Sequence, residues 1–367
     1  MKTRVSLLKC RNYDEKEVRV AVENAFGLLG GMEGFVKKGE KVLIKPNILS
    51  GRPPEDGVCT HLEVIRQVVR LVKDCGALPF IADNPGGSVA TIEAYKGSGL
   101  MELAKEEGIE LKETCGIKVV KGLPFASYVF ECDKIISLPK MKTHSLMGLT
   151  GAIKNMYGVI AGLHKAELHK QFPEASELMK VLVDIFEIRK PDIVLMDWIV
   201  SMDGDGPASG RLRNTGILIA SEDSVSVDAV FSSLIGCEPL ELLTTREAYG
   251  RGLGEANMEN IDILGEDLKG CAIDDFQLPG KISLVNIFGP FAKPLARLVR
   301  FGPAIDGRLC LRCRICLETC PVSAITMDSK KPSIDLKKCI RCMCCHEVCP
   351  HRAVLLKTNI LARSFGL

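Results

Sequence analysis

The chain has 367 residues, more than one core of about 150 residues usually contains, so its length predicts one large domain and a smaller one. Hydrophobic residues make up 46% and charged residues 26%, which is ordinary for a globular protein and excludes wholesale disorder. The formal net charge of +2 excludes a strongly basic nucleic-acid binder. No apolar run is long enough for a membrane helix or a signal peptide, so we expect a soluble cytoplasmic protein without a transmembrane segment.

Short apolar runs of the β type alternate with amphipathic helical stretches along residues 1–280. Six buried strands are predicted, at Lys41–Lys45, Leu78–Asp83, Lys134–Pro139, Asp192–Asp197, Gly216–Ala220 and Ile261–Leu264. Helices are predicted between them, notably at His61–Cys75, at Ser176–Arg189 and from Ser224, which we expect to be an N-cap. This alternation predicts an α/β domain over residues 1–280, with a mainly parallel sheet and helices on both faces.

Cysteine is the unusual residue of this chain. There are 16 cysteines, and nine of them fall between Cys310 and Cys349. Eight of the nine form two runs of the pattern C-x-x-C-x-x-C-x-x-x-C-P, which end at Pro321 and Pro350. A disulfide scaffold explains them poorly, because the long core-forming sequence before the runs needs no cross-links in a reducing compartment.

Each run has the spacing that holds a [4Fe-4S] cluster. A tight loop with cysteines three residues apart presents three thiolates to one cube, and the fourth thiolate comes from the other run. We therefore predict two clusters, the first held by Cys310, Cys313, Cys316 and Cys349 and the second by Cys339, Cys342, Cys345 and Cys320. Cys344 falls outside the repeat; it is an alternative ligand, an oxidation-sensitive thiol or, as we expect, a bystander.

These runs make residues 301–357 similar to a bacterial two-cluster ferredoxin, with two repeats 29 residues apart. We place the ferredoxin domain and its C-terminal tail at 301–367, and a linker or docking helix at 281–300. The segments around Ile325 and Ser333 predict a short hairpin between the runs, as in that family. A zinc ribbon is the alternative, but it would use pairs of C-x-x-C and leave half of the cysteines idle.

The cysteine-rich end of the chain is basic. Residues 301–367 contain 11 Lys and Arg against 5 Asp and Glu. This excess compensates the roughly four negative charges of two oxidised cubes with their thiolates. Nucleic-acid binding is the alternative, but only Phe301 and Phe365 could interleave with the basic residues, so we expect no nucleic-acid partner.

Polar side chains follow several predicted strands, at the carboxyl ends where ligands of such a sheet bind. Lys45 and Asn47 follow the first strand, Asp83 ends the second, and Asp203 lies in a Gly-rich loop after the fourth. We predict these four residues to bind a cofactor. The loop around Asp203 and Asp205 would bind an anion through its amides or a divalent ion through its carboxylates, and a plain turn is the alternative.

The stretch from Pro139 to Gly158 is the richest in chemistry. It supplies our candidate catalytic residues, Lys140, Lys142, His144, Lys154 and Asn155. The lysines could hold a phosphate or carboxylate, and His144 could donate or accept a proton. A solvated loop with a helix cap is the alternative.

Other site signals are weaker. His164 and His169 lie five residues apart, a spacing that does not place them on one helix face as an i,i+4 metal pair. The sequence contains no P-loop, no G-x-G-x-x-G and no G-x-S-x-G, which disfavours a dinucleotide site of the usual kind. A flavin or another organic cofactor needs no short motif and stays open.

Four segments together resemble the family called domain of unknown function 362. They are K-V-L-I-K-P-N from Lys41, D-N-P-G-G from Asp83, P-K-M-K-T-H from Pro139 with the following T-G-A-I-K-N-M-Y-G, and M-D-G-D-G-P-A-S-G from Met202. The resemblance covers most of residues 1–280, and this family is often fused to a ferredoxin module. It implies a cytoplasmic iron-sulfur protein of bacteria or archaea whose α/β domain binds a ligand at these loops, and it implies no particular reaction.

Our first functional hypothesis is a redox enzyme. Its two clusters would relay electrons from a soluble donor to an anionic small substrate or a second cofactor in the α/β domain, and His144 would supply a proton. The alternative is a non-catalytic electron carrier or binding protein whose α/β domain recognises a partner. A third interpretation is a metal-cofactor assembly factor that uses His164, His169, Asp203 or Asp205.

Overall fold

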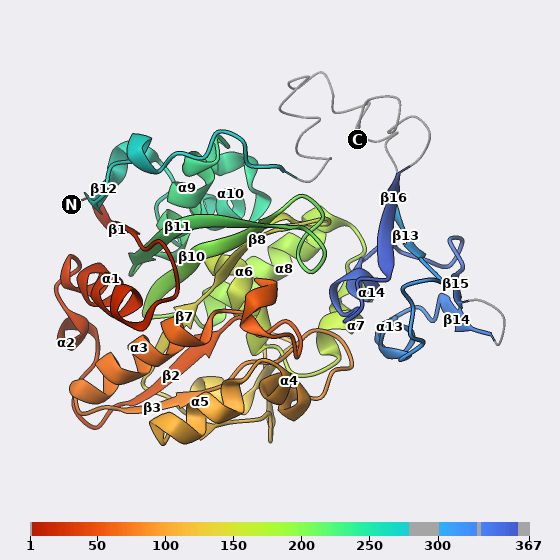
Figure 1. Cartoon of the computed structure of the whole chain (residues 1–367), viewed down its shortest axis with the longest axis horizontal. Helices are drawn as coiled ribbons and strands as arrows, with labels where there is room; N and C mark the ends of the chain where they lie inside the picture. Colours follow the sequence, from red (N-terminus) through yellow and green to blue (C-terminus); the bar gives the residue numbers. More distant parts are fainter. Residues whose placement is uncertain (1, 279–300, 329–331, 359–367) are drawn as a thin grey trace.

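The computed structural model describes residues 2–278, 301–328 and 332–358 (Figure 1). We call residues 2–278 the α/β domain and residues 301–358 the cysteine-rich domain. The predicted linker at 281–300 and the tail after residue 358 lie outside the described residues. Among the helices within the described ranges, none has both the length and the apolar character that crossing a membrane requires.

The α/β domain is built around one large sheet. Its main path follows the order β12, β1, β11, β10, β7, β2, β3 and β4. The bounds of these strands, in that order, are Ile261–Gly265, Thr3–Lys9, Arg211–Ser221, Ile193–Asp203, Lys134–Leu138, Lys41–Pro46, Leu78–Ile81 and Glu110–Leu111. β11 is antiparallel to both of its neighbours, and every other pair along this path is parallel. The predicted α/β class and mainly parallel sheet are confirmed.

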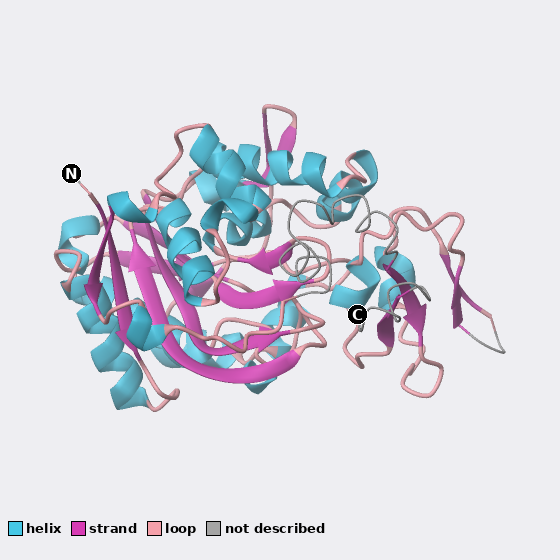
Figure 2. Cartoon of the chain, turned by 90° about the horizontal axis from the view of Figure 1, so that it is seen from above, coloured by secondary structure: helices cyan, strands magenta, loops and turns pink. Residues whose placement is uncertain are grey.

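Helices cover both faces of the sheet (Figure 2). On β2, Val42 and Ile44 pack into one core, while Leu43 points the opposite way into the other. The first core includes α1 (Glu15–Gly27), α3 (Leu62–Asp74) and α5 (Leu100–Glu107). The second includes α6 (Ala152–Asn155), α8 (Ala175–Ile188), α9 (Ser224–Leu234) and α10 (Leu243–Gly250). Each fully buried aliphatic side chain contributes about 1.5–3 kcal/mol, which explains why the predicted strands read as continuous apolar runs.

Smaller elements complete the α/β domain. They are α2 (Met32–Phe35), α4 (Thr91–Gly97), α7 (His164–Gln171) and the antiparallel hairpin of β5 (Ile117–Val120) and β6 (Leu123–Ala126). The start of α9 differs by one residue from the prediction. Asp223, not Ser224, is the N-cap, because its carboxylate accepts the backbone N–H groups of Val225 and Ser226.

The segment that follows β7 is a buried strand and not a loop. Pro139 separates β7 from β8 (Lys140–His144), which pairs with β10 and with β9 (Gly148–Thr150). All five side chains of β8 are buried, although four of them are polar. The alternative of a solvated loop is therefore wrong for residues 140–144, and the polar groups of β8 find partners inside the protein.

The cysteine-rich domain contains two short helices and two strand pairs. The helices are α13 (Ile315–Thr319) and α14 (Cys344–Glu347), and the outer strands are β13 (Phe301–Ile305) and β16 (Val354–Thr358). Between the helices, β14 (Ile325–Met327) pairs antiparallel with β15 (Pro332–Ile334), as the hairpin prediction requires.

Candidate functional site: cysteine loops and an interdomain cavity

The two cysteine runs have the same backbone conformation. Left-handed residues recur 29 positions apart, as Arg312 and Arg341 (φ 56° and 56°), Arg314 and Met343 (φ 69° and 64°), and Ser323 and Arg352 (φ 49° and 51°). Residues other than glycine seldom adopt this conformation, at a cost of about 1–3 kcal/mol each. Its repetition in both runs shows two loops built to one design.

The cysteines of the first predicted set lie close together. Burial raises the pKa of Cys316 to about 11, and Cys349, Cys313 and Cys310 add to the increase. The cysteine spacing predicts that these three cysteines and Cys316 hold the first cluster. One of their sulfurs, Cys349 Sγ, also accepts the backbone N–H of Ala353 at 3.3 Å, the kind of hydrogen bond that stabilises a cluster thiolate.

The second predicted set is arranged in the same way. Burial raises the pKa of Cys345 well above its ordinary value, and Cys342, Cys316, Cys339 and Cys320 add to the increase. Backbone N–H groups again point to sulfur, from Arg341 to Cys339 at 3.4 Å and from Ala324 to Cys320 at 3.2 Å. These donors and thiols suit two iron-sulfur clusters, and the assignment of the eight ligands stays a prediction.

The cysteine-rich domain packs against the α/β domain beside α4 and α7 (Figure 1). Buried Arg52 donates hydrogen bonds to the carbonyls of Ala208, at 2.9 Å, and Cys349. The Ser88 N–H donates to the Thr319 hydroxyl at 3.1 Å, and Arg352 pairs with Asp56 at 3.2 Å. These contacts fix α13 and the segment that follows α14 against the α/β domain.

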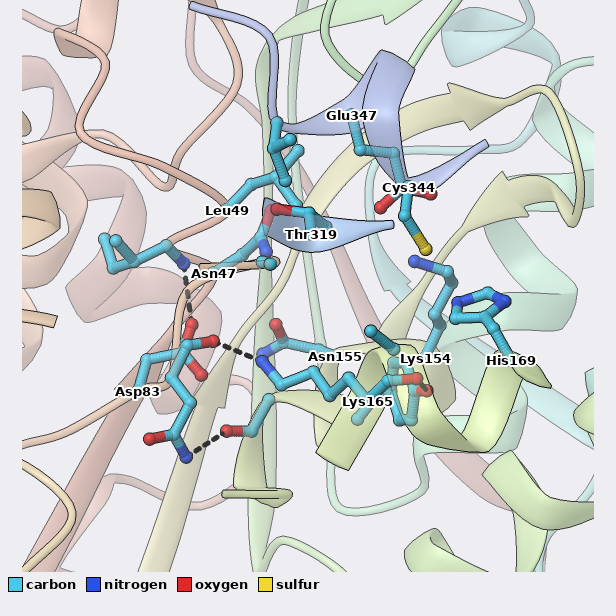
Figure 3. A pocket seen from close by; sticks show the side chains of 18 residues that line it. Asn47, Leu49, Asp83, Lys154, Asn155, Lys165, His169, Thr319, Cys344 and Glu347 are labelled. Carbon is cyan, nitrogen blue, oxygen red and sulfur yellow. Dashed lines mark hydrogen bonds between the residues drawn. The ribbon is translucent and has the colours of Figure 1, made fainter. Parts of the chain in front are cut away.

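A cavity of about 80 Å³ lies at this contact, with walls from both domains (Figure 3). From the α/β domain, it is lined by residues after β2 and β3, by α6 and α7, and by the segment between these two helices, including Asn47, Leu49, Asp83, Gly87, Lys154, Lys165 and His169. From the cysteine-rich domain, it is lined by Thr319, Cys344, Glu347 and Val348. Its place beyond the carboxyl ends of β2 and β3 is the one that the sheet type predicts.

Two lysines of the cavity differ in their partners. Lys165 donates to the carbonyls of Asn84 and Pro85 at 2.5 and 3.0 Å, and burial lowers its pKa to about 8. Lys154 forms no hydrogen bond or ion pair with any described residue, and burial lowers its pKa while Glu347 and Cys344 oppose this effect. Lys154 therefore points an amino group into the cavity that has no partner among the described residues.

Asp83 and its neighbours form the floor of the cavity. Lys45, on β2, lies behind Asp83 and pairs with its carboxylate at 2.8 Å, and both side chains are fully buried. The other Asp83 oxygen accepts the N–H of Ile48 at 2.7 Å. Asn155 donates to the Ser137 hydroxyl at 2.8 Å and so faces Lys45 with its side-chain oxygen. The ion pair between Lys45 and Asp83 fixes the loops after β2 and β3, and it leaves neither charge without a partner.

Glu347 enters the cavity from α14 and is held from behind by His144. The Nδ1 atom of His144 accepts the backbone N–H groups of Leu146 and Met147, both at 3.2 Å. The ring proton is therefore on Nε2, which lies 2.9 Å from Glu347 Oε1. Burial lowers the pKa of His144 to about 4, and Lys154 adds to this decrease. A neutral histidine thus orients a carboxylate of the other domain.

Cys344, Lys154 and His169 point toward one another on one side of the cavity (Figure 3). His169 is only 6% exposed, packs edge-on against Tyr157, and forms no hydrogen bond through its ring with the described residues. Burial lowers its pKa to about 4, so it is neutral near neutral pH. A thiol, an ammonium group and an unpartnered imidazole are therefore available to a ligand.

Comparison with family models shows which protein family the chain belongs to. The model described as "Domain of unknown function (DUF362)" matches residues 42–233, slightly more than half of the sequence. The chain belongs to the DUF362 family. A second model, described as a 4Fe-4S dicluster domain, matches residues 302–350, so this DUF362 protein is an iron-sulfur protein. Both matches agree with the resemblances seen in the sequence.

Two similar proteins place this DUF362 chain among known ones. It is 29% identical over 282 residues to a thylakoid-associated protein of Synechocystis sp., covering 75% of this chain and 87% of the relative. The lactate racemase apoprotein of Thermoanaerobacterium thermosaccharolyticum aligns with 61% of the chain at 12% identity, with a TM-score of 0.41. The alignment spans 55% of that racemase chain, and a likeness of this size carries no argument about activity.

The DUF362 fold brings only part of the predicted site to the cavity. Asn47, Asp83, Lys154 and Asn155 line it, while Lys45 and His144 lie directly behind Asp83 and Glu347. Lys142 lies behind Asn47, whose side-chain oxygen accepts from its ammonium group at 2.6 Å; burial lowers the pKa of Lys142 to about 7.

Two predicted residues belong to other buried ion pairs. Lys140 contacts Asp197 at 2.8 Å and Tyr13 at 2.6 Å, away from the cavity. Asp203 pairs with Arg211 at 2.9 Å and with Arg213 at 3.1 Å. Neither residue lines the cavity, and the charge of each is balanced where it lies.

Sequence reasoning missed several cavity residues of this DUF362 protein. Lys165 and Glu347 carried no motif, and His169 was considered only with His164, which is exposed on α7. Cys344 was expected to be a bystander, yet it lines the cavity. One available signal was its position, because Cys344 replaces a residue that is Ile315 in the first repeat.

Proposed function

We propose that this protein is an oxidoreductase in which two [4Fe-4S] clusters pass electrons to a small anionic substrate in the interdomain cavity. The carrying observation is that one cavity is lined both by Lys154 of the α/β domain and by Cys344, which adjoins the predicted cluster ligand Cys345. The bound clusters would supply the electrons one at a time. The electron donor would be a soluble one-electron carrier.

The charges of the cavity support a small anion. Asp83 is balanced by Lys45, and Lys165 is held by two carbonyls, so the ammonium group of Lys154 is the cation left without a partner among the described residues. Glu347 contacts neutral His144 and would repel an anion at its own edge of the cavity. A ligand with one negative end near Lys154 and a neutral or protonated end near Glu347 suits this arrangement.

The size of the cavity sets a limit on the substrate. At about 80 Å³ it holds a ligand of a few non-hydrogen atoms, whereas sites for drug-sized ligands are roughly 300–1,000 Å³. This favours direct reduction of a small molecule over a flavin in the same space. The matched dicluster domain supports the electron supply, and the thylakoid-associated relative leaves the predicted cytoplasmic location a prediction.

Calorimetry on the full-length protein with its clusters tests this proposal. Small anions such as nitrite, sulfite and formate are titrated into the wild type, Lys154→Gln and Lys180→Gln. Lys180 is an exposed lysine of α8 and serves as the matched control. We expect at least one anion to bind the wild type and Lys180→Gln, and to bind Lys154→Gln at least about tenfold more weakly, since about 1.4 kcal/mol corresponds to a factor of ten. Binding of none of these anions, or equal binding to all three proteins, would favour the electron carrier whose α/β domain recognises a partner.

A further inference from the structure

We infer that the second cluster delivers the electrons to the cavity and that the Cys344 thiol couples this cluster to the cavity. The inference rests on the proposed function, because it names the electron route to that same site. It assigns different roles to two loops that the sequence treats as equivalent repeats.

The two cysteine loops differ in their surroundings. In the first loop, Leu311, Arg312 and Cys313 are exposed to solvent. At the equivalent positions of the second loop, Arg341 is exposed but Ile340 and Cys342 are partly buried. The first loop is therefore the more accessible of the two to a soluble electron donor.

The second loop also provides more of the cavity wall. From α14, Cys344, Glu347 and the following Val348 line the cavity, whereas α13 contributes Thr319 at its last residue. Cys344 adjoins Cys345 and lies two residues after Cys342, both predicted ligands of the second cluster. Cys344 therefore connects the cavity wall to Cys345, a predicted ligand of the second cluster.

Cys344 places a polar S–H group beside the second cluster's ligand set, because it adjoins the predicted ligand Cys345 and is equally buried. The equivalent residue of the first loop is Ile315, which has no polar side-chain group. A polar S–H group beside a cluster stabilises the added negative charge of the reduced form, and so raises the reduction potential of that cluster. The second cluster therefore receives electrons from the first.

A second, independent observation, the unpartnered ring of His169, indicates that a ligand binds beside Cys344 in the cavity. His169, 6% exposed, has no ring hydrogen bond with the described residues and points into the cavity beside Lys154 and Cys344 (Figure 3). The ammonium group of Lys154 also favours the reduced state of a cluster on the other side of Cys344. An anion bound there would offset that charge and make the second cluster a stronger reductant.

The route balances one electron at a time. A soluble one-electron donor is oxidised as it reduces the first cluster, and the first cluster is reoxidised as it reduces the second. The second cluster is then reoxidised as the bound substrate gains the electron. Two such passes, with two protons taken from solvent, complete a two-electron reduction.

Potentiometric titration of the full-length protein, followed by electron paramagnetic resonance, tests the inference without any substrate. Cys344→Ile gives the second loop the residue of the first, and Ile315→Cys gives the first loop the thiol of the second. We expect Cys344→Ile to move one cluster signal to a more negative potential, and Ile315→Cys to move the other signal to a more positive one. Cys344→Ser, which keeps a donor, should shift the potential less than Cys344→Ile. All variants should retain the iron content of the wild type.

The inference is overturned if Cys344→Ile and Cys344→Ser, with full iron content, leave both potentials where the wild type has them. It is also overturned if Cys344→Ile and Ile315→Cys move the same signal. Failure of the proposed function is a separate result, because it appears as the absence of Lys154-dependent anion binding in calorimetry, whatever the potentials are.

Discussion

His144 Nε2 lies 2.9 Å from Glu347 Oε1, so a strand of the α/β domain holds a side chain of the cysteine-rich domain at the edge of the cavity. Both side chains are largely buried, at 2% and 12% exposure. The contact therefore links three features of the molecule: the packing of the two domains, the orientation of Glu347 and the charge of the cavity. Each of these can be measured.

A double-mutant cycle with His144→Ala and Glu347→Ala should show a favourable coupling of about 0.5–3 kcal/mol, because the two groups contact each other away from water. The same cycle on the exposed pair Glu167 and Lys170 should give at most about 1 kcal/mol. Urea unfolding, followed by the fluorescence of Trp198, measures both couplings. Equal couplings in the two pairs would show that burial adds nothing to the His144–Glu347 contact.

Gly87→Ala should weaken the packing of the two domains. Gly87 has a φ of +64°, and a Cβ there would meet Thr319 Oγ1 at 2.5 Å and Val348 Cγ1 at 2.7 Å. Gly108→Ala is the matched control, because Gly108 also has a positive φ, +57°, but has no heavy atom within 4 Å of such a Cβ. Limited proteolysis should cleave between the domains faster in Gly87→Ala than in Gly108→Ala. Equal cleavage rates would mean that backbone strain alone accounts for the effect.

Stability should fall on acidification, in part because of His61. This residue stacks on Tyr13 and faces Asp197, Lys140 and Glu55; burial lowers its pKa from 6.5 to about 4. The unfolded chain therefore takes up a proton before the folded protein does. The contribution of His61 is complete above about pH 6.5 and is lost as the pH falls toward about 4.

The variant His61→Asn keeps a side-chain acceptor for the Glu63 N–H at the start of α3 but removes the titration. Its free energy of unfolding should change less than that of the wild type between about pH 7 and about pH 5. His164→Asn, at an exposed histidine of α7, is the control and should behave like the wild type. If the free energy of unfolding of His61→Asn depends on pH as strongly as that of the wild type, the assignment of this pH dependence to His61 is wrong.

Local patterns predicted the frame of this fold well. Strands such as β2 and β7 are apolar on both faces, and the cysteine spacing alone indicated two equivalent loops. Residues beyond the carboxyl ends of β2 and β3 were predicted to form part of a ligand site, and two of them, Asn47 and Asp83, line the cavity. These features depend on neighbours in the sequence, which is why they could be predicted.

The remaining site residues depend on contacts between distant segments. Lys140 and Lys154 carry the same charge in the same stretch, yet Lys140 is balanced by Asp197 while Lys154 faces the cavity. No local pattern distinguishes them, because the difference comes from the distant segments that surround each one. Glu347 was invisible for the same reason: its role depends on the packing of α14 against β8.

The most direct test of the account is the rate at which the reduced clusters are reoxidised by small oxidised anions under anaerobic conditions. The full-length wild type and Lys180→Gln should be reoxidised by at least one anion, such as nitrite or sulfite, faster than in buffer alone, and Lys154→Gln should lose most of that acceleration. Electron delivery to the cavity would be contradicted if no anion accelerates reoxidation. It would also be contradicted if an anion accelerates the reoxidation of Lys154→Gln as much as that of the wild type.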